Sequence, residues 1–125
     1  MENVFKHPVV LVVEDEVLVR MNIVGSMEDA GFTVFEAGNA DQAIRMLEAH
    51  PEIALLFTDI DMPGSMDGLK LAAAVRNRWP PVKIVITSGH VKIRSEDMPV
   101  EGQFFSKPYD PSKVVSTLWE LARAP

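Results

Sequence analysis

Cysteine is absent from this sequence. Its absence excludes disulfide bonds, thiolate zinc sites and a cysteine nucleophile. The three histidines, His7, His50 and His90, share no metal-ligand spacing. A chain without cysteine fits the reducing environment of the cytoplasm.

Long apolar runs are also missing: none approaches the ~18 residues that span a bilayer. Residues 1–8 contain neither the apolar core nor the small-residue cleavage site of a signal peptide. The net charge of -6 argues against bulk attraction to nucleic acid or to an anionic membrane. We therefore expect a soluble, cytoplasmic protein with no direct nucleic-acid partner and no membrane insertion.

What is present is an ordinary globular composition, with 125 residues of which 47% are hydrophobic. A chain of this length buries roughly two-thirds of its unfolded surface, which suffices for one core. No internal repeat or change of composition divides it. We predict a single domain over residues 1–125, with no output domain after its last helix.

The most informative stretch is residues 53–63. Five consecutive apolar residues, 53–57, are typical of a strand buried on both faces of a parallel sheet. The strand ends at Asp59, followed two residues later by Asp61. Open α/β sheets bind their ligands at the carboxyl ends of strands, so Asp59 is a candidate site residue. The alternative is that Asp59 only opens a turn.

Around this stretch, short β-branched or aromatic runs alternate with helical patterns. Asn39, followed by Gln42, and Asp110, followed by Pro111, are predicted helix caps. Val17, Leu18, Met21, Val24 and Met27 lie at helical spacing. Strands are predicted at residues 9–13, 33–36, 53–57, 82–86 and 103–105; the helix within residues 91–99 is expected to be short or irregular. Five βα units predict a parallel sheet covered by helices on both faces.

Four predicted strands end in polar residues. Because parallel strands share the edge at which their carboxyl ends lie, these side chains are expected to meet there. They are Glu14, Asp15, Asp59, Asp61, Thr87, Ser88 and Lys107. This convergence is hard to explain by turn formation alone.

The carboxylates of this group predict a cation site. If the first and third strands are neighbours, Asp15 and Asp59 lie on strands ~4.8 Å apart. Two carboxylates about 5 Å apart repel by roughly 3 kcal/mol at an effective dielectric constant of 20, and Glu14 adds to this. Such a cluster holds either a proton or a cation, and all-oxygen ligands suit Mg²⁺ or Mn²⁺. For Asp15 the alternative is a helix cap.

Together with a lysine and a hydroxyl, a bound cation makes a phosphoryl-transfer site. Asp59 is the predicted nucleophile, which becomes an acyl phosphate. Lys107, the Ser88 hydroxyl and the cation are then expected to hold the phosphoryl oxygens. An exposed lysine and a turn hydroxyl are the alternatives for Lys107 and Ser88.

These residues carry a family resemblance, since nearly the whole chain resembles the receiver domain of two-component response regulators. The matching segments are 12–16 (VVEDE), 58–63 (TDIDMP), 66–69 (MDGL), 87–89 (TSG) and 107–108 (KP). The resemblance implies a flavodoxin-like fold with strand order 2-1-3-4-5. It also implies phosphorylation of Asp59 by a sensor histidine kinase or histidine phosphotransfer protein. The result is then expected to be read by a downstream protein.

The resemblance assigns further roles. Glu14 and Asp15 match the acidic pair that binds Mg²⁺, and Asp61 matches the position whose backbone carbonyl binds the metal. Lys107 matches the lysine that pairs with phosphate, and a cis peptide bond is expected between it and Pro108.

The sequence departs from the family pattern at several points. The acidic pair is Glu-Asp, and the loop over residues 63–68 is one residue longer than usual. Either Thr87 or Ser88 supplies the hydroxyl, and Ser88 is preferred because Gly89 follows it. Phe104 matches the switch aromatic but has no hydroxyl; a plain core role is the alternative. His90, two residues after Ser88, is predicted to tune phosphoryl lifetime, or else is an idle surface residue.

Three other functions are possible. The Asp59-Ile60-Asp61 pattern resembles the DxD of haloacid-dehalogenase-like phosphohydrolases, but the chain has no room for their cap domain. A flavin-binding module needs a phosphate loop, and the acidic loop at residues 14–16 repels phosphate. A degenerate receiver that acts only as a scaffold is disfavoured because Asp59 and Lys107 are both present.

Overall fold

The computed structural model describes residues 7–61, 68–89 and 103–124. Five parallel strands form one sheet in the order β2-β1-β3-β4-β5. They are β1 (Val9–Val13), β2 (Thr33–Ala37), β3 (Leu55–Asp59), β4 (Lys83–Ser88) and β5 (Gln103–Ser106). This order confirms the predicted flavodoxin-like fold.

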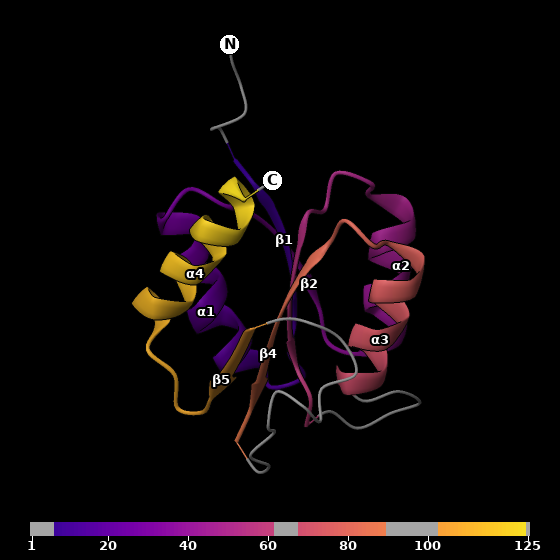
Figure 1. The fold of residues 1–125 in the computed structure, drawn as a ribbon. Coiled ribbons are helices and arrows are strands. Elements are labelled where there is room, and N and C mark those ends of the chain that lie inside the picture. Colours follow the sequence, from indigo (N-terminus) through magenta and orange to yellow (C-terminus); the bar gives the residue numbers. More distant parts are fainter. Residues whose placement is uncertain (1–6, 62–67, 90–102, 125) are drawn as a thin grey trace.

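Helices cover both faces of the sheet (Figure 1). One face carries α1 (Val17–Asp29) and α4 (Pro111–Arg123), and the other carries α2 (Ala40–Ala49) and α3 (Gly68–Arg78). The helix predicted within residues 91–99 lies outside the described residues, so the label α4 belongs to the helix that follows β5.

The sheet separates two hydrophobic cores. Alternate residues of β1 enter opposite cores: Val10 and Val12 face α1 and α4, whereas Leu11 and Val13 face α2 and α3. All five residues of β3 are buried. Burial on both sides explains why this segment reads as a continuous apolar run that ends in an acid.

Two helices begin at the predicted caps. The side chain of Asn39 accepts a hydrogen bond from the Gln42 backbone N–H at 2.9 Å. The Gln42 side chain reaches back to the Gly38 N–H at 2.7 Å, one residue before the partner of an ordinary capping box. At α4, Asp110 accepts from the Ser112 N–H at 3.0 Å, and proline occupies the first turn.

One helix face differs from the expectation. Three apolar residues of α1, predicted to lie on the buried face, are exposed by 54%, 80% and 61%: Val17, Leu18 and Met21. The buried residues of α1 are Ile23, Val24 and Met27. Because α1 is apolar on several sides, spacing alone did not identify the side that packs on the sheet.

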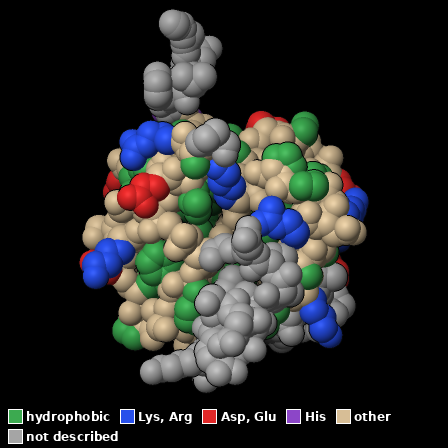
Figure 2. All heavy atoms as spheres, in the orientation of Figure 1, with side chains coloured by type: hydrophobic (Ala, Val, Ile, Leu, Met, Phe, Trp, Pro, Cys, Tyr) green, Lys and Arg blue, Asp and Glu red, His purple; other side chains and the backbone are tan. Residues whose placement is uncertain are grey.

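No helix within the described parts of the chain is both long and apolar enough to cross a membrane. On the face seen in Figure 2, described Lys and Arg side chains are spread over both helix layers rather than gathered in one patch.

The strand end that carries Asp59 is packed directly against the start of α3. A Cβ atom on Gly68 would lie 2.6 Å from Ile60 Cα and still closer to the Asp59 carbonyl oxygen. Both contacts are with backbone, which cannot rotate away. Only glycine therefore permits α3 to approach the site this closely.

We expect Gly68→Ala to lower the stability of the fold by about 1–3 kcal/mol, the usual range for overpacking. Gly25→Ala in α1 is the matched control, since its added Cβ meets nothing within 4 Å. Replacing this helical glycine should leave stability unchanged or raise it by about 0.5–1 kcal/mol. Urea unfolding of both variants is the measurement, and equal stability of the two would contradict the packing argument.

Candidate functional site

The polar residues predicted at the strand ends do meet at one edge of the sheet. β1 lies between β2 and β3, and Asp59 at the end of β3 is the register partner of Thr87 on β4. Lys107 follows β5, and its backbone N–H donates to the Ser88 carbonyl at 2.9 Å. In Figure 1 this edge lies at the bottom, where the arrowheads of β4 and β5 point.

The centre of the site is a lysine shared by two carboxylates. Lys107 Nζ lies 2.9 Å from Asp59 Oδ2 and 3.2 Å from Glu14 Oε1. Both acids are 2% exposed, and the lysine side chain is 21% exposed. One ammonium therefore partly neutralises two buried acids that come from different strands.

Burial and charge set the proton affinities here. Burial, helped by the negative charge of Asp59, raises the pKa of Glu14 against the opposing effects of the Glu16 N–H and Lys107. Burial alone would lower the pKa of Lys107. Its hydrogen bonds and ion pairs with Asp59 and Glu14 outweigh this and raise the pKa above the ordinary value. The lysine therefore stays charged, while Glu14 bears an electrostatic cost.

Backbone contacts fix the position of Glu14. Its N–H donates to the Ala37 carbonyl at 3.1 Å, and its side chain accepts from the Glu16 N–H at 3.1 Å. Arg20 donates to the Glu14 carbonyl at 2.7 Å and to the Glu36 carboxylate at 3.1 Å. Sequence reasoning missed Arg20, whose only signal was its place one turn into the helix that follows the acidic loop.

The predicted acidic cluster is present among the described residues. Glu14, Asp15 and Asp59 each offer a carboxylate oxygen, and these oxygens lie within 4.8 Å of one another. The helix-cap alternative for Asp15 is wrong, because the N-cap residue of α1 is Glu16, which makes no side-chain cap. Three converging carboxylates fit a hard divalent cation such as Mg²⁺.

Asp61 takes a different part in the site. Its backbone N–H donates to Asp59 Oδ1 at 3.1 Å. Its Oδ2 accepts from Ser88 Oγ and from the Gly89 N–H, both at 3.0 Å. The carboxylate of Asp61 is thus directed at the end of β4, and it is not part of the acidic cluster.

The two candidate hydroxyls have opposite surroundings. Ser88 Oγ is hydrogen-bonded to Asp61, whereas Thr87 Oγ1 is buried without a hydrogen-bond partner among the residues described. Thr87 is the register partner of Asp59, so both side chains project from the same face of the sheet. Thr87 therefore shares a sheet face with the predicted nucleophile, whereas Ser88 is connected to it through Asp61.

One aromatic residue lies near the site without having been predicted there. Tyr109, the only tyrosine, meets the Phe57 ring edge-on at 5.7 Å. Burial, followed by the charge of Glu14, raises the pKa of Tyr109 to about 12. Sequence reasoning missed it, although it comes directly after Lys107-Pro108.

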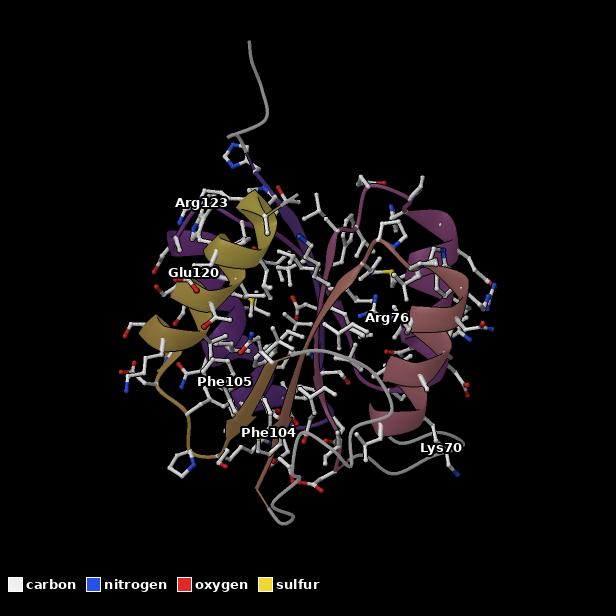
Figure 3. All side chains as sticks on the ribbon, in the orientation of Figure 1. Lys70, Arg76, Phe104, Phe105, Glu120 and Arg123 are labelled. Atoms are coloured by element: carbon white, nitrogen blue, oxygen red, sulfur yellow. The ribbon has the colours of Figure 1, made fainter. Side chains whose placement is uncertain are left out.

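The other predicted features are distributed as follows. Phe104 is half-buried against the core beneath α2 and α3, whereas its neighbour Phe105 packs on the opposite core (Figure 3). The peptide bond between Lys107 and Pro108 is cis, as the resemblance implied. His90 and residues 63–67 of the loop predicted at 63–68 lie outside the described residues.

A parallel sheet with an acidic cluster and a strand-end lysine at one edge defines a class of signalling domain. The model of the response regulator receiver domain matches residues 10–118, and the chain belongs to this family. Receiver domains are regulatory components of two-component signalling.

Individual relatives agree with this assignment. The chain is 31% identical over 115 residues to the response regulator receiver protein CpdR of Brucella abortus, covering 90% of this chain and 94% of CpdR. It is 31% identical over 116 residues to the sensor kinase CckA of the same species, covering 90% of this chain but 12% of CckA. The chain thus spans only a small part of some relatives.

Among solved structures, a response regulator receiver protein from Sinorhizobium medicae superposes with a TM-score of 0.87 at 25% identity. The match covers 98% of both chains.

The raised pKa of Glu14 predicts that ionised Glu14 lowers the free energy of unfolding, and that this effect depends on pH. A carboxyl that binds its proton more tightly when folded stabilises the fold below its unfolded pKa, near 4.5, and this contribution is lost as pH rises through the folded pKa. Without divalent cations, Glu14→Gln should therefore raise the melting temperature at pH 7 by a few degrees. The gain should shrink towards pH 4.

Thermal melts across this pH range are the measurement, with Glu16→Gln in the same loop as the exposed control. A gain that is independent of pH, or equal in the two variants, would contradict the assignment of the cost to buried Glu14.

Proposed function

We propose that the chain is a phospho-acceptor receiver in which Asp59 takes a phosphoryl group from a sensor histidine kinase or a histidine phosphotransfer protein. The observation that carries this proposal is the pairing of a buried strand-end carboxylate with Lys107, beside a second acid. A carboxylate with an adjacent fixed cation is what phosphoryl transfer from a charged donor requires.

The proposed reaction transfers the phosphoryl group from phosphohistidine to Asp59, and water later removes it. An oxygen of the Asp59 carboxylate forms a bond to phosphorus while the phosphorus–nitrogen bond of phosphohistidine breaks. The bonding electrons leave with the imidazole, which takes up a proton. Hydrolysis later returns the carboxylate and inorganic phosphate.

Lys107 has the central role in this step. Its ammonium already contacts Asp59 Oδ2. From this position it can form an ion pair with the negatively charged phosphoryl oxygens once the group is transferred. Tyr109, whose ring packs on Phe57, lies near enough to Glu14, Lys107 and Asp59 for their charges to affect its pKa.

Glu14, Asp15 and Asp59 are proposed to hold Mg²⁺ or Mn²⁺, with the backbone carbonyl of Asp61 as the further ligand that the family resemblance implies. When bound, the cation neutralises charge on the phosphoryl oxygens. The carboxylates of the chain provide the binding energy and set the position of the ion.

A hydroxyl at the end of β4 is proposed to bind the phosphoryl group and transmit its presence. Ser88 is the preferred residue, and the buried Thr87 hydroxyl remains the alternative. Phe104 is proposed to shift with this strand end by repacking its ring against the α2–α3 core. A downstream protein is proposed to read the change. The tuning of phosphoryl lifetime by His90 stays a prediction.

The phosphohydrolase alternative requires Asp61 to act as a proton donor aimed at a leaving group. Its Oδ2 instead accepts two hydrogen bonds, from Ser88 Oγ and the Gly89 N–H, and is directed at the end of β4. This arrangement supports the receiver function over hydrolysis of an external substrate.

Incubation with acetyl phosphate and Mg²⁺ should add the mass of one phosphoryl group to the intact protein, and hydroxylamine should remove it. Asp59→Asn should abolish the addition, whereas Asp61→Asn, which keeps the neighbouring backbone, should retain it. Intact mass and peptide mapping are the measurements. Label on an Asp61 peptide, or full labelling of the Asp59→Asn variant, would refute the proposal.

A further inference from the structure

Two hydrogen bonds connect the end of β4 to the side chain of Asp61. The Ser88 hydroxyl and the Gly89 N–H both donate to the same oxygen, Asp61 Oδ2, at 3.0 Å. Hydrogen bonds to an ionised carboxylate are roughly twice as strong as those between neutral groups. Two of them on one oxygen fix both the hydroxyl and the backbone that follows it.

This contact is connected to the acceptor carboxylate on one side. The Asp61 N–H donates to Asp59 Oδ1 at 3.1 Å, while Lys107 occupies Oδ2 at 2.9 Å. Both oxygens of Asp59 therefore already have a partner. A phosphoryl group on either oxygen disturbs one of these two contacts.

The same strand end is connected to Lys107 on the other side. The Lys107 N–H donates to the Ser88 carbonyl at 2.9 Å. A Cβ built on Gly89 would lie 3.4–3.9 Å from the aliphatic carbons of Lys107, so the lysine side chain passes over this glycine in van der Waals contact range. Asp61 and Lys107 thus hold the Ser88–Gly89 segment between them.

From this geometry we infer that Asp61 is a positioning residue whose carboxylate holds the Ser88 hydroxyl in the unphosphorylated state and competes with the phosphoryl group for it. The inference rests on the proposed function, in which Ser88 binds the phosphoryl oxygens. A hydroxyl has one proton to donate, so Ser88 cannot donate to Asp61 and to a phosphoryl oxygen at once. Forming the second contact requires breaking the first.

The consequence is a threshold for switching. The hydrogen bond to Asp61 stabilises the resting position of β4, and the phosphoryl group must outcompete it before the strand end moves. Removing the carboxylate should make the activated arrangement easier to reach. The cost removed is that of a hydrogen bond to a charged group.

The test uses beryllofluoride, a mimic of the phosphoryl group, at saturating Mg²⁺. Asp61→Ala should bind beryllofluoride on the order of tenfold more tightly than the parent, the effect of losing one charged hydrogen bond. Asp61→Asn is the matched control, because it removes the same charge but keeps an acceptor oxygen for Ser88. It should bind nearly as the parent does. In a Ser88→Ala background, the gain from Asp61→Ala should be clearly smaller, because only the contact with the Gly89 N–H is then lost.

Three results would overturn the inference. They are unchanged or weaker binding by Asp61→Ala, an equal gain in Asp61→Asn, which would indicate simple charge repulsion, and a gain of the same size without the Ser88 hydroxyl. All substitutions at this position leave its backbone N–H and carbonyl in place. Changes in the other ligands of the site are therefore not expected to confuse the comparison.

A second measurement needs no ligand and separates this inference from the proposed function. In the unphosphorylated parent, nuclear magnetic resonance couplings should show one χ1 rotamer for Ser88, which becomes averaged in Asp61→Ala and is retained in Asp61→Asn. A fixed Ser88 rotamer in Asp61→Ala overturns the inference whatever beryllofluoride does. A parent that shows the fixed rotamer but binds no beryllofluoride refutes the proposed function, and with it the switching role of the contact.

Discussion

The double ion pair of Lys107 with Glu14 and Asp59 is the interaction on which the site depends. Two carboxylates that are each 2% exposed would repel each other strongly without a cation between them. The lysine supplies that cation from the opposite end of the sequence. The strand order makes this possible, because β3, which carries Asp59, lies beside β1 and is separated from β5 only by β4.

The surrounding fold holds each member of this triad by its backbone. Gly68 lets α3 approach the strand end that carries Asp59, and Arg20 ties the Glu14 carbonyl to the edge of β2 through Glu36. The backbone N–H of Lys107 donates a hydrogen bond to the Ser88 carbonyl. These backbone contacts hold the three charged side chains in place at the ends of neighbouring strands.

Much of this arrangement was predictable, because local patterns determine it. The continuous apolar run before Asp59 indicated a central parallel strand, and Asn39 and Asp110 indicated helix starts. The burial of α1 was not predictable, since a helix that is apolar on several sides gives no single periodic signal. The contacts of Arg20, and the direction of the Asp61 side chain towards Ser88, depend on loop geometry that spacing does not encode.

Lys107 neutralises Glu14 and Asp59 where a divalent cation would otherwise do so, and titration calorimetry with Mg²⁺ tests this most directly. Lys107→Met should bind Mg²⁺ several-fold more tightly than the parent, because the ammonium no longer competes for Glu14 and Asp59. Without Mg²⁺ the variant should be less stable than the parent by up to about 3 kcal/mol, and Mg²⁺ should narrow the gap. Lys113→Met, on the exposed side of α4, should change neither property. Unchanged or weaker Mg²⁺ binding by Lys107→Met would contradict the account.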